Sequence, residues 1–273
     1  MYLSLAGTLV RVTGARGRLA ESLGEVFAPL LEPARKGRRA SLLVRLTGGP
    51  AGITVGCGSD TVQAAGTGHA VALAEHLLFS RWARRDSRHL VLHAAAVARR
   101  GRALLLVGEK GAGKTTLAAA LVQRGLLLGG DETVPLRLED GRLAALYRPL
   151  RFKPGGERLP LLRGRRLRFA IYGGDAGRYP LWYARPLARA LGRGRYRLRG
   201  IVFLQRHPGR RCRLERLEPL PVLHRLLGAA YNLERVAQPA LDCLERLLPR
   251  CPAWRLEHGD APRALKLLEE LAF

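Results

Sequence analysis

The decisive stretch is Gly108-Glu109-Lys110-Gly111-Ala112-Gly113-Lys114-Thr115, which fits the pattern G-x-x-x-x-G-K-[ST] of a phosphate-binding loop. An apolar run over residues 103–107 precedes it and predicts a strand. An alanine- and leucine-rich run over residues 115–124 follows and predicts a helix that ends at Gly125. When a strand, a glycine-rich loop and a helix follow one another in this way, N–H groups of the loop and of the helix N-terminus converge on one anion. The sequence therefore predicts a site for phosphate groups.

Each part of the loop has an expected role. Backbone N–H groups cradle phosphates, Lys114 reaches the β- and γ-phosphates, and the Thr115 hydroxyl holds Mg²⁺. The residues expected to bind the nucleotide are Gly108, Glu109, Lys110, Gly111, Ala112, Gly113, Lys114, Thr115 and Thr116.

Composition places the chain among ordinary globular proteins. Its 273 residues are 47% hydrophobic, enough for one large domain or two small ones. No apolar run reaches the length of a membrane span, and the first residues lack the pattern of a signal peptide. The four cysteines show no C-x-x-C spacing, which argues against a metal site or a disulfide framework. We therefore expect a cytoplasmic protein.

The formal net charge of +25 is carried mostly by arginine. One interpretation is an anionic partner, and the other is an arginine-rich composition without a functional demand. The charge is concentrated in residues 151–215, where Glu157, Asp175 and Glu215 are the only acids. The aromatic residues nearby are not spaced like a base-stacking platform, so nucleic acid is not the partner we expect.

Patterning along the chain predicts two domains. Residues 1–88 read as a small α+β unit and residues 89–273 as the domain that carries the loop. We expect a largely looped region at 151–194 and an N-cap at Asp260 for the last helix. The other predicted strands are 2–12, 41–46, 53–57, 90–97, 126–128, 133–138, 143–147, 196–204 and 253–256, and the other predicted helices are 19–31, 69–82, 221–233 and 239–248.

A phosphate loop needs a carboxylate to hold the metal. The strand predicted over 196–204 is followed by Gln205 and Arg206 and cannot supply one, whereas Asp131 and Glu132 follow the strand directly after the loop helix. Neighbouring strand residues face opposite ways, so a turn is required for both to face the nucleotide. One carboxylate could then hold Mg²⁺ while the other takes a hydroxyl proton. The alternative is a solvated acidic turn.

His93 lies in an apolar strand one strand upstream of the loop. Taken alone, such a histidine is more often a core residue than a site residue.

Three segments together resemble one family. His93-Ala94-Ala95-Ala96-Val97, the loop, and Gln123-Arg124-Gly125-Leu126-Leu127-Leu128-Gly129-Gly130-Asp131-Glu132 are similar in spacing to HPr kinase/phosphorylase. The resemblance is closer to the HPr-kinase-like proteins of peptide-modification gene clusters, including kinases of lasso-peptide precursors. Those proteins carry an Arg-Pro-x-x-x-Lys element, to which Arg148-Pro149-Leu150-Arg151-Phe152-Lys153 is similar.

The resemblance implies a fold like the nucleotide domain of phosphoenolpyruvate carboxykinase, with a mixed sheet, and ATP and Mg²⁺ as cofactors. It implies that Asp131 is the base, that His93 lies near the transferred phosphoryl group, and that the chain forms oligomers. Glu132 stands where the family has a second Asp. The family's C-terminal signature, which is tied to phosphorolysis, is not found here, so we do not expect the reverse reaction.

We expect an ATP- and Mg²⁺-dependent kinase that phosphorylates a hydroxyl, serine above all, on a peptide or a small molecule. Lys114 neutralises phosphate charge, Asp131 is the base with His93 beside it, and Thr115 and Glu132 hold the metal. Four cations are candidates for binding the substrate: Arg148, Arg151, Lys153 and Arg206. The alternative function is a nucleotide-dependent switch ATPase that binds or assembles on an anionic partner.

Overall fold

The computed structural model describes residues 1–33, 39–49, 52–152, 167–171 and 182–272. The chain divides into two compact units, each described by itself. The first comprises Met1–Arg84, Pro149–Glu157 and Arg168–Arg185, and the second comprises Arg85–Arg148, Arg158–Leu167 and Pro186–Phe273. The division after Arg84 lies close to the domain boundary predicted at residue 88. The first unit, however, also includes two later segments that the prediction assigned to residues 89–273.

The first unit is built on a six-stranded sheet with the order β3-β1-β2-β4-β5-β6. Its strands are β1 (Tyr2–Leu5), β2 (Thr8–Thr13), β3 (Leu31–Glu32), β4 (Leu42–Gly49), β5 (Gly52–Cys57) and β6 (Asp60–Ala64). The single strand predicted over residues 2–12 is a hairpin, because Ala6 and Gly7 take positive φ values of 45° and 85° and turn the chain. The β6 strand was not predicted.

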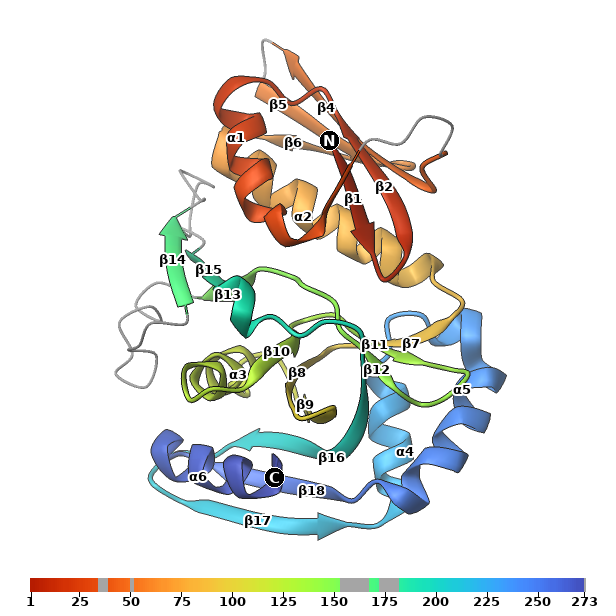
Figure 1. Ribbon diagram of the computed structural model, residues 1–273, viewed down its shortest axis with the longest axis vertical. Helices are drawn as coiled ribbons and strands as arrows, with labels where there is room; N and C mark the ends of the chain where they lie inside the picture. The colour runs from red at the N-terminus through yellow and green to blue at the C-terminus, as the bar shows by residue number, and fades with distance from the viewer. Residues whose placement is uncertain (34–38, 50–51, 153–166, 172–181, 273) are drawn as a thin grey trace. The chain divides into compact units, whose positions relative to one another are not determined.

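Two helices and a small second sheet complete this unit (Figure 1). Helix α1 (Gly17–Val26) is shorter than predicted, because Pro29 lies in a separate 3-10 helix, Ala28–Leu30. Helix α2 (Thr67–Arg85) buries Trp82, whose indole Nε1 donates to the Thr8 hydroxyl at 3.2 Å. In the described part of the region 151–194, which we expected to be largely looped, three strands pair: β13 (Leu150–Phe152), β14 (Leu167–Ile171) and β15 (Trp182–Pro186). Residues 153–166 and 172–181 of that region lie outside the described residues.

The second unit holds a nine-stranded mixed sheet. The order β10-β8-β9-β16-β12-β11-β7 forms its main path, and β18 joins β16 and β17. Strand β16 runs parallel to both β9 and β18, while the other pairs are antiparallel. The strands are β7 (His89–Leu92), β8 (Ala94–Arg99), β9 (Arg102–Val107), β10 (Leu127–Gly130), β11 (Val134–Arg137), β12 (Leu143–Ala144), β16 (Arg195–Arg206), β17 (Cys212–Leu217) and β18 (Ala253–His258).

Helices cover both faces of this sheet (Figure 1). Because successive strand residues face opposite ways, Ala94 and Leu105 share one face and are buried with α4 (Pro219–Gly228) and α5 (Leu233–Leu247). The other face is covered by α3 (Lys114–Gln123) and α6 (Ala261–Ala272). None of the helices in the described ranges is long and apolar enough to cross a membrane.

Several sequence predictions in this unit are confirmed. Helix α3 ends where Gly125 takes a φ of 106°, which an L-residue rarely adopts. Asp260 caps α6 by accepting the Arg263 N–H at 3.0 Å. The hairpin across residues 139–141 forms as β11 and β12. The fold is therefore mixed α/β, as predicted, and the parallel strands β9, β16 and β18 direct their C-terminal ends toward one edge of the sheet.

Candidate functional site

The 108–115 loop joins β9 to α3, as the sequence predicts. Gly111 and Gly113 take φ values of 92° and 93°, the left-handed region that glycine adopts without strain. A Cβ on Gly108 would lie 2.7 Å from the carbonyl oxygen of Leu204 in β16. Glycine at residue 108 therefore lets the loop lie directly against the neighbouring parallel strand.

The loop is also held by His258, a residue that sequence reasoning missed. This side chain is 6% exposed at the end of β18, and its Nε2 donates to the Ala112 carbonyl at 2.9 Å. Burial lowers the pKa of His258, the bond to Ala112 opposes that shift, and nearby Arg206 adds to it. The parallel register of β16 and β18, which pairs Arg206 with His258, brings this residue to the loop, and the sequence carries no local signal for that register.

The Lys114 ammonium is enclosed by three acceptors. Its Nζ lies 2.6 Å from the Gly108 carbonyl oxygen, 3.1 Å from that of Glu109 and 3.0 Å from Nε2 of His93. An ammonium has three N–H donors, so each acceptor takes one. Burial lowers the pKa of Lys114, and the carboxylates of Glu132 and Asp131 oppose that shift.

His93 reaches Lys114 because the chain leaves the sheet at this residue. The strand predicted over 90–97 is in fact two strands: β7 pairs with β11, and β8 pairs with β9 and β10. The His93 N–H donates to the Ala229 carbonyl at 2.8 Å instead of to a strand neighbour. Burial and the Lys114 charge lower the pKa of His93, while the Glu132 carboxylate raises it, so the ring stays neutral to lower pH than usual.

A turn brings Asp131 and Glu132 to the same site, as the sequence analysis required. Glu132 has a φ of 62°, which is unusual for a residue with a side chain. The Asp131 carboxylate, 3% exposed, accepts from the Thr115 hydroxyl, and Glu132 Oε1 lies 3.7 Å from Nδ1 of His93. We expected Thr115 to hold the metal together with Glu132, whereas the Thr115 hydroxyl contacts Asp131 in the structure.

Tyr231 and Asn232 also belong to this site, and no motif identified them. Tyr231 Oη lies 2.6 Å from His93 Nδ1 and donates to the Glu132 carbonyl at 3.2 Å. Asn232 is 3% exposed and hydrogen-bonds Val91 N–H and the carbonyls of Asp86 and His89. The two residues precede α5, and their contacts span nearly the whole unit in sequence, so local patterning carries no signal for them.

The four candidate substrate-binding cations have different surroundings. Arg148 lies beside the site: it is 3% exposed, donates to the Thr133 hydroxyl at 2.6 Å and contributes to the lowered pKa of His93. Arg206 is exposed at the end of β16, next to His258. Arg151 belongs to the first unit, where Nη1 lies 3.5 Å from Oε2 of Glu75. Lys153 lies outside the described residues.

The donor atoms of the site fit a hard cation. Within the described ranges, no group of three or more His, Cys, Asp or Glu residues could hold a metal by protein side chains alone. Thr115, Asp131 and Glu132 offer only oxygen ligands, which Mg²⁺ prefers, and Mg²⁺ is commonly held by one or two carboxylates together with substrate phosphates. The ammonium of Lys114 and the loop N–H groups suit the phosphates themselves.

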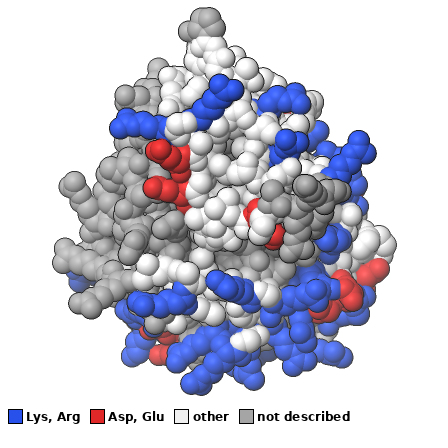
Figure 2. All heavy atoms as spheres, turned by 45° about the horizontal axis from the view of Figure 1, so that its top comes forward, with Lys and Arg blue, Asp and Glu red and all other residues white. Residues whose placement is uncertain are grey.

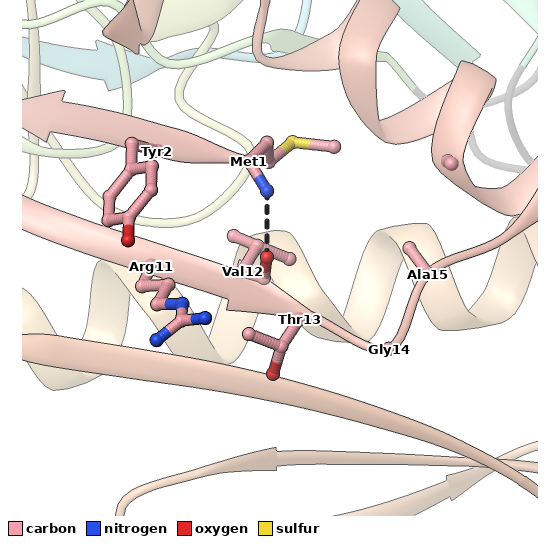
Figure 3. A pocket seen from close by; sticks show the side chains of 8 residues that line it. Met1, Tyr2, Arg11, Val12, Thr13, Gly14 and Ala15 are labelled. Carbon is pink, nitrogen blue, oxygen red and sulfur yellow. Dashed lines mark hydrogen bonds between the residues drawn. The ribbon is translucent and has the colours of Figure 1, made fainter. Parts of the chain in front are cut away.

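One cavity lies away from this site, in the first unit. Figure 3 shows this cavity of about 500 Å³, beside the bond from the Met1 amine to the Val12 carbonyl. Its one charged lining side chain, Arg11, lies over the Tyr2 ring at 5.9 Å from the centroid. None of the residues predicted from the sequence to form a site lines this cavity.

The arginine excess is visible on the surface. Figure 2 shows a face on which Lys and Arg side chains greatly outnumber Asp and Glu. Part of this charge is balanced locally, as where Arg255 Nη2 lies 2.7 Å from Oε2 of Glu215.

No protein-family model and no curated protein matches the chain. Among solved structures, the chain is similar to the Hpr(Ser) kinase/phosphatase from Coxiella burnetii. The sequence identity is 15%, the match covers 66% of this chain and 92% of that chain, and the TM-score is 0.31. A TM-score this low does not establish a shared fold, so the functional argument rests on the residues of the site.

Proposed function

We propose that this chain is a phosphotransferase that transfers the γ-phosphate of ATP to a hydroxyl group. The observation that carries the proposal is the meeting of one ammonium, one hydroxyl and two carboxylates where β9 ends. Lys114 and Thr115 lie at the start of α3, and Asp131 and Glu132 directly follow β10. Thr115 bonds Asp131 directly, and His93 lies 3.0 Å from Lys114 and 3.7 Å from Glu132. A chance match to the loop motif would not require this convergence.

Each side chain has a part in the proposed chemistry. Loop N–H groups and Lys114 bind the phosphates, and Lys114 stabilises charge that develops during transfer. Asp131 is the base: its carboxylate already accepts a hydrogen bond from a hydroxyl, that of Thr115, and an acceptor hydroxyl would present the same group. His93 holds Lys114 over the loop.

The same residues would hold Mg²⁺. While the Thr115 O–H donates to Asp131, the lone pairs of its oxygen remain available to a cation, and Glu132 is the second oxygen donor. When bound, the ion supplies neutralisation of the phosphate charge.

The acceptor has to enter from the open side of the site. The side chains of His93 and Glu132 are 29% and 37% exposed, and Tyr231 is 38% exposed, so they line the accessible side, whereas Asp131 and Lys114 lie deeper. A protruding primary hydroxyl, such as that of serine in an extended peptide or of a small molecule, is the acceptor that fits this arrangement.

The test measures ADP release from Mg·ATP, with and without a library of serine-containing peptides. We expect near-zero release from Mg·ATP alone and stimulation by a subset of peptides, with phosphate found on serine. Lys114→Ala should lower the stimulated rate by about a hundredfold or more, because a fixed charge at the transferred group is lost. Lys266→Ala, a change at an exposed lysine in α6, is the matched control.

Two results would contradict the proposal. Near-normal turnover in Lys114→Ala would show that Lys114 of the loop takes no part in the reaction. Rapid hydrolysis without any acceptor, stimulated by nucleic acid, would instead indicate the switch ATPase that the sequence leaves as the alternative.

A further inference from the structure

We propose that Tyr231 is a positioning residue that fixes the tautomer of His93 and thereby the place of Lys114. The assignment of Lys114 to ATP rests on the function proposed above, but the tautomer itself does not. The geometry that points to this role is a continuous chain of hydrogen bonds from Lys114 through His93 and Tyr231 to the Glu132 backbone.

The direction of each bond follows from the donors available. The Lys114 ammonium can donate hydrogen bonds but cannot accept one, so the 3.0 Å contact requires a lone pair on Nε2 of His93. A neutral imidazole with a lone pair on Nε2 carries its proton on Nδ1. That N–H lies 2.6 Å from Tyr231 Oη, so the phenol oxygen must accept it.

Tyr231 can accept from His93 because its own proton has another acceptor. The Tyr231 O–H donates to the Glu132 carbonyl at 3.2 Å. The three contacts are therefore mutually consistent with the His93 proton on Nδ1, and the His93 ring also has a hydrogen bond with the Glu132 backbone. If the Tyr231 proton pointed at Nδ1 instead, the His93 proton would sit on Nε2 and face an ammonium.

The same hydroxyl supports the turn that carries the second carboxylate. Glu132 holds a φ of 62°, a conformation that persists only where surrounding contacts hold it. The bond from Tyr231 to the Glu132 carbonyl is one such contact. The ring of Tyr231 also meets the His93 ring edge to face, with centroids 5.7 Å apart and planes at 86°.

Tyr231 is itself fixed by the backbone on both sides. Its N–H donates to the Val91 carbonyl at 2.8 Å, and the preceding Ala230 forms an isolated bridge with Leu92 in β7. Asn232, next in the chain, is held by three hydrogen bonds to the same region. The hydroxyl is therefore carried on a rigid segment, which is what a positioning residue requires.

The test uses Tyr231→Phe, which removes the hydroxyl and keeps the ring. Tyr196→Phe is the matched control, since the Tyr196 hydroxyl accepts the Arg193 N–H at 3.0 Å in β16 and does not contact His93. Nitrogen NMR of the histidine rings, with His93 assigned through its loss in His93→Gln, reports the tautomer directly. We expect the Nδ1–H form in the wild type and in Tyr196→Phe, and a shift toward the Nε2–H form in Tyr231→Phe.

ATP affinity, measured by calorimetry, tests the consequence for Lys114. Tyr231→Phe should weaken ATP binding by about fivefold, the effect of one lost hydrogen bond, and should add nothing in a His93→Gln background. An Nδ1–H signal for His93 that survives in Tyr231→Phe would overturn the proposal, as would a changed tautomer with unchanged ATP affinity. A wild type that shows the Nδ1–H form but does not bind ATP would overturn the proposed function and leave the tautomer assignment standing.

Discussion

Thr115 Oγ1 lies 3.0 Å from Oδ2 and 3.2 Å from Oδ1 of Asp131, so the end of the loop and the end of β10 meet through a hydroxyl and a carboxylate. The contact orients the Thr115 lone pairs away from Asp131 and gives the carboxylate a hydroxyl partner before any acceptor arrives. It also makes the roles of the two acidic residues separable by experiment.

Asp131→Asn should retain ATP binding and lose transfer by about a hundredfold or more, because an amide cannot take the acceptor proton. Calorimetry measures binding, and peptide-stimulated ADP release at saturating Mg²⁺ measures transfer. Recovery of the rate at high Mg²⁺ would place Asp131 at the metal and contradict its role as base.

Glu132→Gln should raise the Mg²⁺ concentration that gives half-maximal turnover, because an amide oxygen is a weaker ligand than a carboxylate for a hard cation. The rate at saturating Mg²⁺ should fall much less than in Asp131→Asn. A magnesium titration of both variants makes the comparison, and an unchanged Mg²⁺ requirement in Glu132→Gln would argue against this role.

Turnover should depend on pH through His93. Burial and Lys114 lower its pKa, so the neutral ring that accepts from Lys114 persists below the ordinary value of 6.5. Activity should therefore be complete at neutral pH and fall as the pH drops through the lowered pKa, when Nε2 gains a proton and repels Lys114. The pH profile of kcat checks this, and His93→Gln should be slower but lack this acidic limb.

Asn232→Ala should destabilise the second unit by roughly 2–4 kcal/mol, because it leaves one N–H and two carbonyls without the buried amide that satisfies them. Urea unfolding measures the free energy of unfolding. Gln238→Ala removes an exposed amide that bonds Asp242 at 2.8 Å within α5, and should change stability by about 0.5 kcal/mol or less. Equal effects of the two variants would contradict the buried role of Asn232.

Nucleic acid should bind weakly at physiological ionic strength and leave turnover unchanged. Binding that depends on many arginine–phosphate contacts falls by orders of magnitude between low and physiological salt. A mobility-shift titration at low salt and at physiological salt measures this binding. Tight binding at physiological salt, with an affinity that ATP alters, would support the switch ATPase.

The local parts of the site could be predicted from the sequence. The loop, its flanking strand and helix and the acidic pair lie within thirty residues, where motif spacing and hydrophobic period both apply. His93 was found through a resemblance, although its apolar surroundings predicted one continuous strand. The break at His93 arises because β7 and β8 pair with different partners, which is a tertiary effect.

The distant parts could not be predicted. His258 and Tyr231 are 146 and 138 residues away from the partners that they contact, Ala112 and His93. Neither lies in a motif, and only the register of β18 beside β16 and the bridge from Ala230 to Leu92 bring them to the loop. Arg151, which the sequence offers as a substrate-binding candidate through the element that begins at Arg148, lies 3.5 Å from Glu75 in the first unit, and its role toward a substrate stays a prediction.

The positive φ of Glu132 is a conformation that suits glycine, whereas the proposed site uses the carboxylate of a glutamate at this residue. A non-glycine residue held in this conformation destabilises the native state by on the order of 1–3 kcal/mol. Glu132→Gly should therefore raise the melting temperature while removing a carboxylate from the site. Selection for heat resistance alone would favour glycine at residue 132, so a library screened only for stability would lose the acidic pair.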